Sequence, residues 1–465
     1  MYLYDNGKNY IYKVEQTHEL FHVNEGTYLL FNPYIFKWVT IDEIGKDILQ
    51  SIILHNNLNV VKNYIINKYN ITKDIYENDA VPYINDLVKK GFLCTRLGSS
   101  EKKDVIDNCL YSPDNTVLES MYLSLEEGCN LNCIYCFNKE NRRKRINDNA
   151  LSLDEIKSCL KQYKELGGQG VVLTGGEPTL NKNFMTICSY AKDMGLIVSV
   201  ITNGTYLNSF DINDIVNNID NLSISIDSVD DSEQKLLWKT NGFSYNENVR
   251  PFLKKYNEFA TVYHKNLEIT IMPVLTSINL ATLKQTVNEI SKELNNVNVR
   301  WVITKYGNIG VNEIDELLSI SNYEYDKAIW DSMSENVEND SLKQFVLSKG
   351  GKDPITFLPH KVLCNPSFFI TYYGDVYPCQ GLENQDFYLG NIRYNTLDKI
   401  LNNDLFNNLK KALYIDNVSY CKDCELRTVC TNINGRPCNK TFDQNCKADI
   451  VYRLYMMTQK VNQNN

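Results

Sequence analysis

Three closely spaced cysteines have the residue types and the spacing of a metal-cluster site. Cys129, Cys133 and Cys136 form the pattern C-x3-C-x2-C, and Tyr135 directly precedes the third thiol. Three thiolates this close in sequence can ligate three irons of a [4Fe–4S] cube and leave the fourth iron open to bind and reduce a small molecule. Structural zinc is the alternative, but it normally takes a fourth Cys or His nearby, and the next cysteine is Cys159. We call residues 127–136 the cluster loop.

Three polar motifs follow apolar stretches further along the chain. They are Thr174-Gly175-Gly176-Glu177-Pro178, then Thr202-Asn203-Gly204, and then Ser223-Ile224-Ser225-Ile226-Asp227. Paired glycines let another group approach the backbone closely, and a carboxylate such as that of Glu177 can receive an ammonium group. The three motifs therefore predict a site for a polar ligand beside the cluster loop.

A second group of cysteines lies near the end of the chain. Cys364 and Cys379 enclose the pattern C-x9-G-x4-C, in which the glycine is Gly374. Five more thiols follow, at Cys421, Cys424, Cys430, Cys438 and Cys446. This density predicts further metal or cluster sites, with a zinc ribbon built from the four thiols between 421 and 438 as the alternative.

The elements that must position these groups alternate between strand and helix. Apolar segments at 120–125, 170–174, 197–202, 222–227, 267–272 and 299–303 have strand character. Ser152 and Glu155 form a capping box, which predicts a helix that ends at Gly167 and Gly168. The alternation predicts an α/β fold, a partial (β/α)6 barrel of TIM type. Because reactive groups gather at the carboxyl ends of barrel strands, we expect the cluster loop and the polar motifs to form one site.

Residues 1–96 form a separate unit in which strands precede helices. Segments 21–23 and 27–31 are predicted strands joined by a turn at 24–26, and helices are predicted over 60–69 and 80–90, with Gly91 as a possible C-cap. The sequence Thr40-Ile41-Asp42-Glu43 has the form of a capping box. It predicts a further helix with an apolar row at Ile41, Ile44, Ile48 and Ile52.

The cluster loop, the Gly-Gly-Glu-Pro motif and the Ser-x-Asp motif, in this order, strongly resemble the radical S-adenosylmethionine (SAM) superfamily. The resemblance implies that a cluster reduces SAM and that a 5′-deoxyadenosyl radical abstracts a hydrogen atom from the substrate. It places Glu177 and the glycines at the methionine amine, Tyr135 and the backbone near Ile303 at the adenine, and Ser225 at the ribose. The implied cofactor-binding residues are Tyr135, Gly175, Gly176, Glu177, Pro178, Asn203, Ser225, Asp227 and Ile303.

The C-terminal cysteines resemble the SPASM domain, which holds two auxiliary [4Fe–4S] clusters, so three such clusters are expected in all. The resemblance assigns Cys421, Cys424, Cys430 and Cys446 to the distal cluster and Cys364, Cys379 and Cys438 to the inner one. Seven residues separate Cys430 from Cys438 where the family commonly has three. No cysteine lies between Cys188 and Cys364, so the inner cluster is expected to have an open iron that a substrate thiolate can occupy. Cys159 and Cys188 fall in predicted helices and are expected to be buried.

The N-terminal unit resembles a winged-helix leader-binding domain, the RiPP recognition element, which binds a peptide along an exposed sheet edge. The resemblances divide the chain into a leader-binding domain (1–96), a linker (97–115), a radical core (116–310), an acidic, irregular bridging region (311–355), a SPASM domain (356–450) and a tail (451–465). They imply two partners, a precursor peptide with a leader and an electron donor such as flavodoxin or ferredoxin.

Composition excludes several other classes of protein. The chain has 465 residues, 43% of them hydrophobic and 23% charged, with a formal net charge of −9. An acidic chain has no general electrostatic footprint for nucleic acid or an anionic membrane. The N-terminus lacks the profile of a signal peptide and no uncharged apolar run reaches membrane-spanning length, so a cytoplasmic location with reduced thiols is expected.

These features together predict a radical SAM peptide maturase that bonds a cysteine sulfur to a carbon of its precursor. Carbon–carbon or carbon–oxygen crosslinking and epimerisation are alternatives, and a non-catalytic iron–sulfur scaffold is an alternative of another class. A formylglycine-forming maturase fits less well, because its family places an aspartate after the equivalent of Cys379, where this chain has Gln380.

Overall fold

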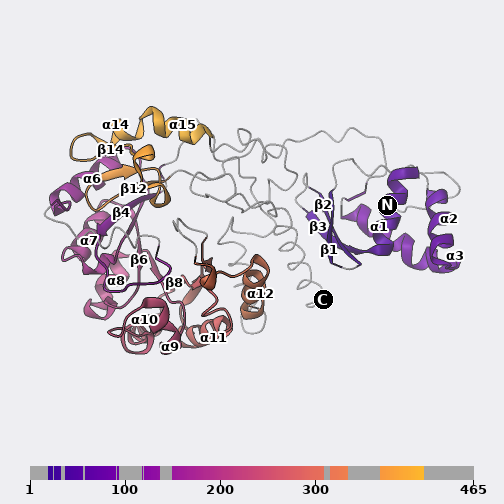
Figure 1. The fold of residues 1–465 in the computed structure, drawn as a ribbon, viewed down its shortest axis with the longest axis horizontal. Helices are drawn as coiled ribbons and strands as arrows, with labels where there is room; N and C mark the ends of the chain where they lie inside the picture. The colour runs from indigo at the N-terminus through magenta and orange to yellow at the C-terminus, as the bar shows by residue number, and fades with distance from the viewer. Residues whose placement is uncertain are drawn as a thin grey trace.

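The computed structural model describes residues 19–24, 26–32, 37–55, 58–90, 92–93, 118, 120–136, 149–307, 315–333 and 367–412. Within this part, one hydrophobic core belongs to the N-terminal unit and a larger one to a nine-stranded sheet with its helices (Figure 1). No helix in these described ranges is both long enough and apolar enough to cross a membrane.

The N-terminal unit is a three-stranded antiparallel sheet followed by helices. Its strands, in the spatial order β1-β2-β3, are β1 (Glu19–Asn24), β2 (Thr27–Asn32) and β3 (Lys37–Asp42). The helices are α1 (Glu43–His55), α2 (Leu58–Tyr69), the short α3 (Lys73–Ile75), the π-helical turn η1 (Tyr76–Ala80) and α4 (Val81–Lys89). The predicted hairpin and helices are present, whereas β3 was not predicted.

The capping box predicted at Thr40 is wrong. Thr40 and Ile41 belong to β3, and Asp42 caps α1 instead, with its Oδ1 accepting from the backbone N–H of Gly45 at 2.7 Å. The β-branched run Val-Thr-Ile favours a strand, and its pairing with β2 outweighs the capping signal. Ile44, expected on the buried row, is 44% exposed. Gly91 lies outside the described residues.

Six parallel strands form the main part of the large sheet. In spatial order they are β10 (Asn298–Trp301), β8 (Glu268–Ile271), β7 (Asn221–Ile224), β6 (Ile197–Thr202), β5 (Gly170–Gly175) and β4 (Ser120–Glu126). All six are predicted strands, and this confirms the α/β class. β7 is shorter than predicted, because the chain leaves the sheet after Ile224. A small parallel pair, β9 (Val274–Leu275) and β11 (Thr304–Lys305), lies beyond β8 and β10 in sequence.

Helices cover the outer side of this curved sheet (Figure 1). They are α6 (Leu153–Glu165), α7 (Phe184–Asp193), α8 (Ile212–Asn218), α9 (Asp231–Trp238), α10 (Arg250–Val262) and α11 (Leu283–Glu293). Helix α6 begins with the predicted capping box, since Glu155 N–H donates to Ser152 Oγ and Ser152 N–H donates to Glu155 Oε2. The predicted irregular region 311–355 contains a helix, α12 (Asn322–Met333), which packs on α11.

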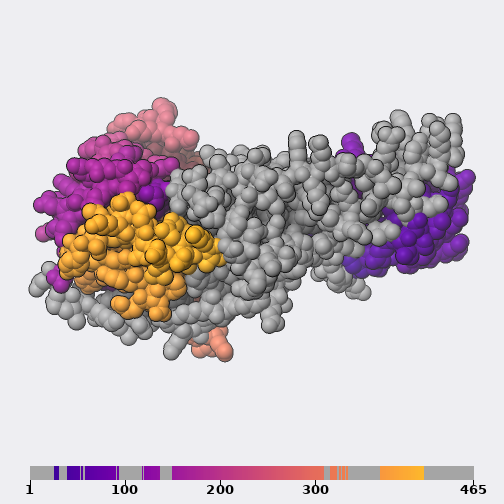
Figure 2. Space-filling model, turned by 90° about the horizontal axis from the view of Figure 1, so that it is seen from above, coloured from indigo at the N-terminus to yellow at the C-terminus, as the bar shows by residue number. Residues whose placement is uncertain are grey.

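The C-terminal part extends the same sheet. β12 (Phe368–Ile370) pairs parallel with β4, and β13 (Asp375–Tyr377) and β14 (Gly390–Asn391) continue antiparallel. The helices α14 (Leu397–Leu401) and α15 (Asp404–Ala412) follow. Figure 2 shows this part, in orange to yellow, packed directly against the parallel-sheet region, and both share one hydrophobic core.

Candidate active site

The parallel sheet brings four polar segments to one edge. β7, β6, β5 and β4 are consecutive neighbours, and each is followed at its carboxyl end by one of the motifs singled out above. The register pairs Ser124 with Thr174 and Thr202 with Ile224, so the four strand ends lie side by side. The cluster loop therefore lies next to the Gly-Gly-Glu-Pro segment, as the barrel prediction required.

The paired glycines are needed because two backbones meet there. A Cβ on Gly175, whose φ is +139°, would lie 2.2 Å from the carbonyl oxygen of Glu126, and a Cβ on Gly176 would lie 2.2 Å from that of Gly128. The N–H groups of Gly176 and Glu177 donate to these same carbonyls, at 2.6 and 2.9 Å. Close backbone approach, expected from the sequence, thus attaches this motif directly to the cluster loop.

The Glu177 carboxylate points into the protein and is 1% exposed. Its Oε1 accepts from the N–H and hydroxyl of Thr179 and from the Thr202 hydroxyl, and its Oε2 accepts from Asn203 N–H at 2.7 Å. Burial raises the pKa of Glu177, while these hydrogen bonds oppose the rise. With both oxygens engaged, the carboxylate links the segment after β5 to the end of β6, and its contact with an ammonium group stays a prediction. Pro178 is buried beside it.

Two contacts hold the cluster loop against the end of α9. The N–H groups of Asn132 and Ile134 donate to the carbonyls of Trp238 and Leu237, at 3.0 and 2.9 Å. These are carbonyls of the last turn of α9, which have no partner within the helix. The helix end therefore fixes the backbone of the loop between its first and third cysteines.

Asp227 forms a further contact to the loop. Its carboxylate is fully buried and accepts from the Tyr135 hydroxyl, from Trp238 Nε1 at 3.2 Å and from Val274 N–H at 2.9 Å. Burial raises the pKa of Asp227 to about 6 and that of Tyr135 well above its usual value. The Tyr135 hydroxyl thus binds protein, which leaves the ring and backbone of this residue for the predicted contact with adenine.

Ser225 and Ile303 lie at other strand ends. Ser225 N–H donates to the Thr202 carbonyl at 2.9 Å, and its side chain is half-buried. Ile303 is buried, and its carbonyl accepts from the Tyr325 hydroxyl of α12 at 2.7 Å. These two residues remain predicted cofactor contacts.

The described cysteines differ in their surroundings. Cys133 is buried, while Cys129 and Cys136 are half-buried, and Leu131 N–H donates to Cys129 Sγ at 3.4 Å. In the described part of the chain, no three Cys, His, Asp or Glu side chains gather closely enough to hold one metal ion. Three thiols on one loop beside an N–H donor are a ligand set that a [4Fe–4S] cube can take.

Of the predicted auxiliary-cluster ligands, only Cys379 falls within the described residues. It is half-buried after β13, next to the apolar contact of Leu382 with Leu409. The other six predicted ligands, Cys364, Cys421, Cys424, Cys430, Cys438 and Cys446, lie outside the described residues. Cys159 and Cys188 are buried in α6 and α7 as expected, and burial raises the pKa of each thiol to about 12.

Comparison with known families agrees with this geometry. The radical SAM superfamily matches residues 123–290, and the iron–sulfur cluster-binding domain SPASM matches residues 364–425. The chain is a radical SAM protein with a SPASM domain. Such a protein uses SAM and several [4Fe–4S] clusters, and the three-thiol loop fits one of these clusters.

Curated relatives of this radical SAM protein act on nucleotides. It is 26% identical to an S-adenosylmethionine-dependent nucleotide dehydratase of Flammeovirga pacifica, over 51% of this chain and 78% of the relative. It is 35% identical to a GTP 3′,8-cyclase of Limosilactobacillus fermentum, over 21% of this chain and 30% of the relative. This chain therefore spans less than a third of the length of the cyclase.

Solved structures share the fold over more of the radical SAM protein. Streptococcus suis SuiB bound to S-adenosylmethionine matches with a TM-score of 0.50 and 15% identity, over 93% of this chain and 99% of SuiB. Native anSMEcpe with bound AdoMet matches with a TM-score of 0.54 and 17% identity, over 74% of this chain and 98% of that protein. At these identities the likeness establishes the fold.

The sequence did not reveal several residues that hold the site together. Trp238 accepts from the cluster loop with its carbonyl and donates its indole N–H to Asp227, and Thr179 and Thr205 bind neighbouring polar side chains. Thr179 directly follows the Gly-Gly-Glu-Pro motif, so its position was a usable signal. No signal in the local sequence pointed to Trp238, because its role depends on where α9 ends in space.

Proposed function

We propose that this radical SAM protein is a peptide maturase that installs thioether bonds between a cysteine sulfur and a carbon of a ribosomally made precursor. The observation that carries the proposal is that backbone hydrogen bonds join the Gly-Gly-Glu-Pro segment to the cluster loop. The same chain has a separate N-terminal unit with its own sheet and core. When bound there, SAM beside a reduced cluster supplies hydrogen-atom abstraction.

The N-terminal unit offers two features that suit a peptide. β3 is the last strand of its sheet, with β2 as its neighbour among the described strands. Beside it lies a cavity of about 540 Å³ between the start of α1 and the helical segments α3 to α4. Its lining is mainly apolar, and Ile44 and Ile75, each 44% exposed, lie at its rim. A strand added to β3 would place alternate side chains toward this cavity, so we propose that residues 1–96 bind the leader.

Two structurally similar proteins support a peptide substrate. SuiB is known bound to the precursor peptide SuiA, and anSMEcpe is known with a Cp18Cys peptide, at TM-scores of 0.50 and 0.52 to this chain. The choice of a thioether rests on the sequence of the SPASM domain. Its inner cluster has three predicted cysteine ligands instead of four, namely Cys364, Cys379 and Cys438, so a substrate thiolate can act as the fourth ligand.

The product distinguishes this reaction from its alternatives. The protein, reconstituted anaerobically, is incubated with SAM, a reductant and a short Cys-bearing peptide encoded beside its gene. A thioether product lacks two hydrogens and resists alkylation at its former cysteine. The same mass loss with an alkylatable cysteine indicates carbon–carbon or carbon–oxygen crosslinking, and an unchanged mass with a D-residue indicates epimerisation.

The triple variant in which Cys129, Cys133 and Cys136 become Ala is the matched control. It should make no 5′-deoxyadenosine while keeping auxiliary iron. Formation of 5′-deoxyadenosine by this variant would contradict the assignment of the cluster loop, and its absence in the wild type would leave only a binding or electron-transfer scaffold. We propose flavodoxin or ferredoxin as the natural electron donor.

Leader binding is tested separately from chemistry. Ala80→Phe places a ring in the cavity beside β3, whereas Leu54→Phe changes a residue of the same unit that is 77% exposed. We expect Ala80→Phe to weaken binding of the full-length precursor more than tenfold in fluorescence anisotropy and to spare SAM cleavage without peptide. Leu54→Phe should affect neither. Equal affinity for all three proteins would assign the unit a structural role only.

A further inference from the structure

The side-chain amide of Asn203 lies against the first thiol of the cluster loop. Its Nδ2 is 3.7 Å from Cys129 Sγ and 2.9 Å from Asn130 Oδ1, so its two hydrogens have two acceptors. The residue lies directly after β6, the strand two places from β4 in the sheet. Asn203 therefore reaches the cluster loop from a different strand.

The orientation of this amide is fixed by its other end. Asn203 Oδ1 accepts from Thr205 N–H at 3.0 Å and from the Thr205 hydroxyl at 2.7 Å. The Thr205 hydroxyl in turn accepts from Asn130 Nδ2 at 2.7 Å. Because a backbone N–H can only donate, the amide oxygen must face Thr205, and the amide nitrogen must face Cys129.

The backbone of Asn203 is held by the carboxylate of Glu177. That carboxylate accepts from Asn203 N–H at 2.7 Å and from the preceding Thr202 hydroxyl at 2.6 Å. A charged, fully buried acceptor makes a stronger hydrogen bond than a neutral one. The Gly-Gly-Glu-Pro motif thus determines where the Asn203 amide stands.

We infer that Asn203 is a positioning residue that raises the reduction potential of the cluster by donating an N–H···S hydrogen bond to Cys129. The inference rests on the proposed function, in which Cys129 is a cluster ligand. A ligating cysteine is a thiolate, so its 4.0 Å thiol contact with Asn130 Oδ1 disappears and the bond from Asn203 becomes charge-assisted. Hydrogen bonds to cluster sulfurs stabilise the added negative charge of the reduced state.

The test replaces the donor without changing the size of the side chain. Asn203→Leu removes both N–H groups and adds no charge, and Asn203→Asp keeps an acceptor for Thr205 but offers no donor to sulfur. Asn208→Asp is the matched control, since Asn208 is exposed and its amide donates to the Asn248 carbonyl of the π-helical turn η5 (Tyr245–Val249). The readout is the potential of the SAM-sensitive EPR signal of the reconstituted holoenzyme.

We expect the equilibrium constant for one-electron reduction to fall about tenfold in Asn203→Leu, which corresponds to about 59 mV. The equilibrium constant should fall at least as far in Asn203→Asp, and in Asn208→Asp it should equal that of the wild type. Equal potentials for Asn203→Leu and wild type would overturn the inference and leave the proposed function intact. If Cys129→Ala keeps the SAM-sensitive signal, the ligand assignment itself fails.

A measurement on the wild type covers the case in which the variants assemble no cluster. Protein labelled with nitrogen-15 at asparagine is reduced and studied by pulsed electron–nuclear double resonance. We expect a hyperfine coupling from an asparagine amide, together with an exchangeable proton that is lost in heavy water. The absence of both couplings in a fully reduced sample would also overturn the inference.

Discussion

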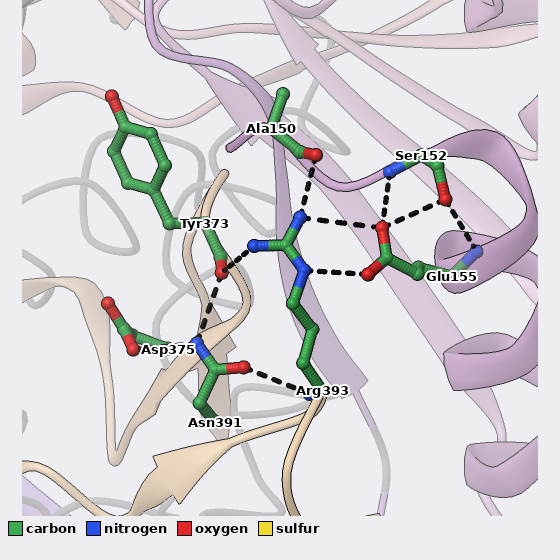
Figure 3. A network of polar contacts seen from close by, with 7 residues as sticks. All are labelled: Ala150, Ser152, Glu155, Tyr373, Asp375, Asn391 and Arg393. Atoms are coloured by element: carbon green, nitrogen blue, oxygen red, sulfur yellow. Dashed lines mark hydrogen bonds and ion pairs between the residues drawn. The ribbon is translucent and has the colours of Figure 1, made fainter. Parts of the chain in front are cut away.

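Arg393 joins the C-terminal strands to the radical SAM core, and Arg393→Ala should destabilise this junction by about 2.5–4 kcal/mol. The guanidinium lies between α6 and the turn that follows β12, and it binds both sides (Figure 3). Its Nε is 2.6 Å from Glu155 Oε1, its Nη2 donates to the Ala150 carbonyl at 2.7 Å, and its Nη1 donates to the Tyr373 carbonyl at 3.3 Å.

The magnitude follows from what each group loses. The ion pair with Glu155 is partly exposed, with 23% and 36% of the two side chains accessible, so its share is discounted to about 1 kcal/mol. The Ala150 carbonyl loses a charge-assisted hydrogen bond, which is worth about 1.5–3 kcal/mol. The Tyr373 carbonyl loses little, since Asn391 Nδ2 still donates to it at 3.1 Å.

Thermal unfolding of the purified protein measures the effect. We expect the midpoint to fall by about 4–6 °C in Arg393→Ala, with a smaller fall in Arg393→Lys, which keeps the charge but not the forked geometry. Lys161→Ala is the matched control, because it breaks an exposed pair on the same helix, with 3.9 Å between Lys161 Nζ and Glu165 Oε1. That variant should stay within about 0.5 kcal/mol of the wild type.

The same contact predicts a dependence on pH. The hydrogen bond that Arg393 donates to Glu155 lowers the pKa of this carboxyl group from 4.5 to about 2. A lowered carboxyl pKa adds stability above the unfolded value, and this stability is lost as pH falls from about 4.5 toward 2. Arg393→Ala should lose less stability than the wild type over this range. Parallel pH profiles, or an Arg393→Ala midpoint equal to that of Lys161→Ala, would refute the reasoning.

Three further predictions concern the candidate site and its core. Gly176→Ala puts a Cβ 2.2 Å from a carbonyl oxygen of the cluster loop, and it should lower the free energy of unfolding by about 3 kcal/mol and reduce the amount of bound iron. In Gly242→Ala the added Cβ lies 3.9 Å from its nearest neighbour, so unfolding and iron assays should give wild-type values. Asp227→Asn weakens three buried hydrogen bonds and should cost about 1–3 kcal/mol in chemical denaturation, and an unchanged midpoint would contradict this. Cys159 and Cys188, buried and with pKa values raised to about 12, should resist iodoacetamide at neutral pH until the protein unfolds, as peptide mass spectrometry would show.

Local patterns were enough to find the main elements and the motifs. The six parallel strands are short apolar runs between polar turns, and the capping box of α6 depends on two residues three positions apart. Where two local signals competed, the stronger tertiary contact decided: Thr40 matched a helix cap but lies in β3, because pairing with β2 involves the whole segment. The sequence did not predict helix α12, because the acidic residues of the surrounding stretch gave it the pattern of an irregular region.

The sequence by itself determined which residues carry the chemistry, because thiol spacing, glycine pairs and the order of motifs are properties of short segments. Only the tertiary structure decided what these residues bind. Tyr135 meets Asp227 across 92 positions and Arg393 meets Glu155 across 238, contacts that depend on strand order. Likewise, the sequence showed a carboxylate at Glu177, but only the fold turned it inward to four donors on Thr179, Thr202 and Asn203, where it holds the backbone of Asn203.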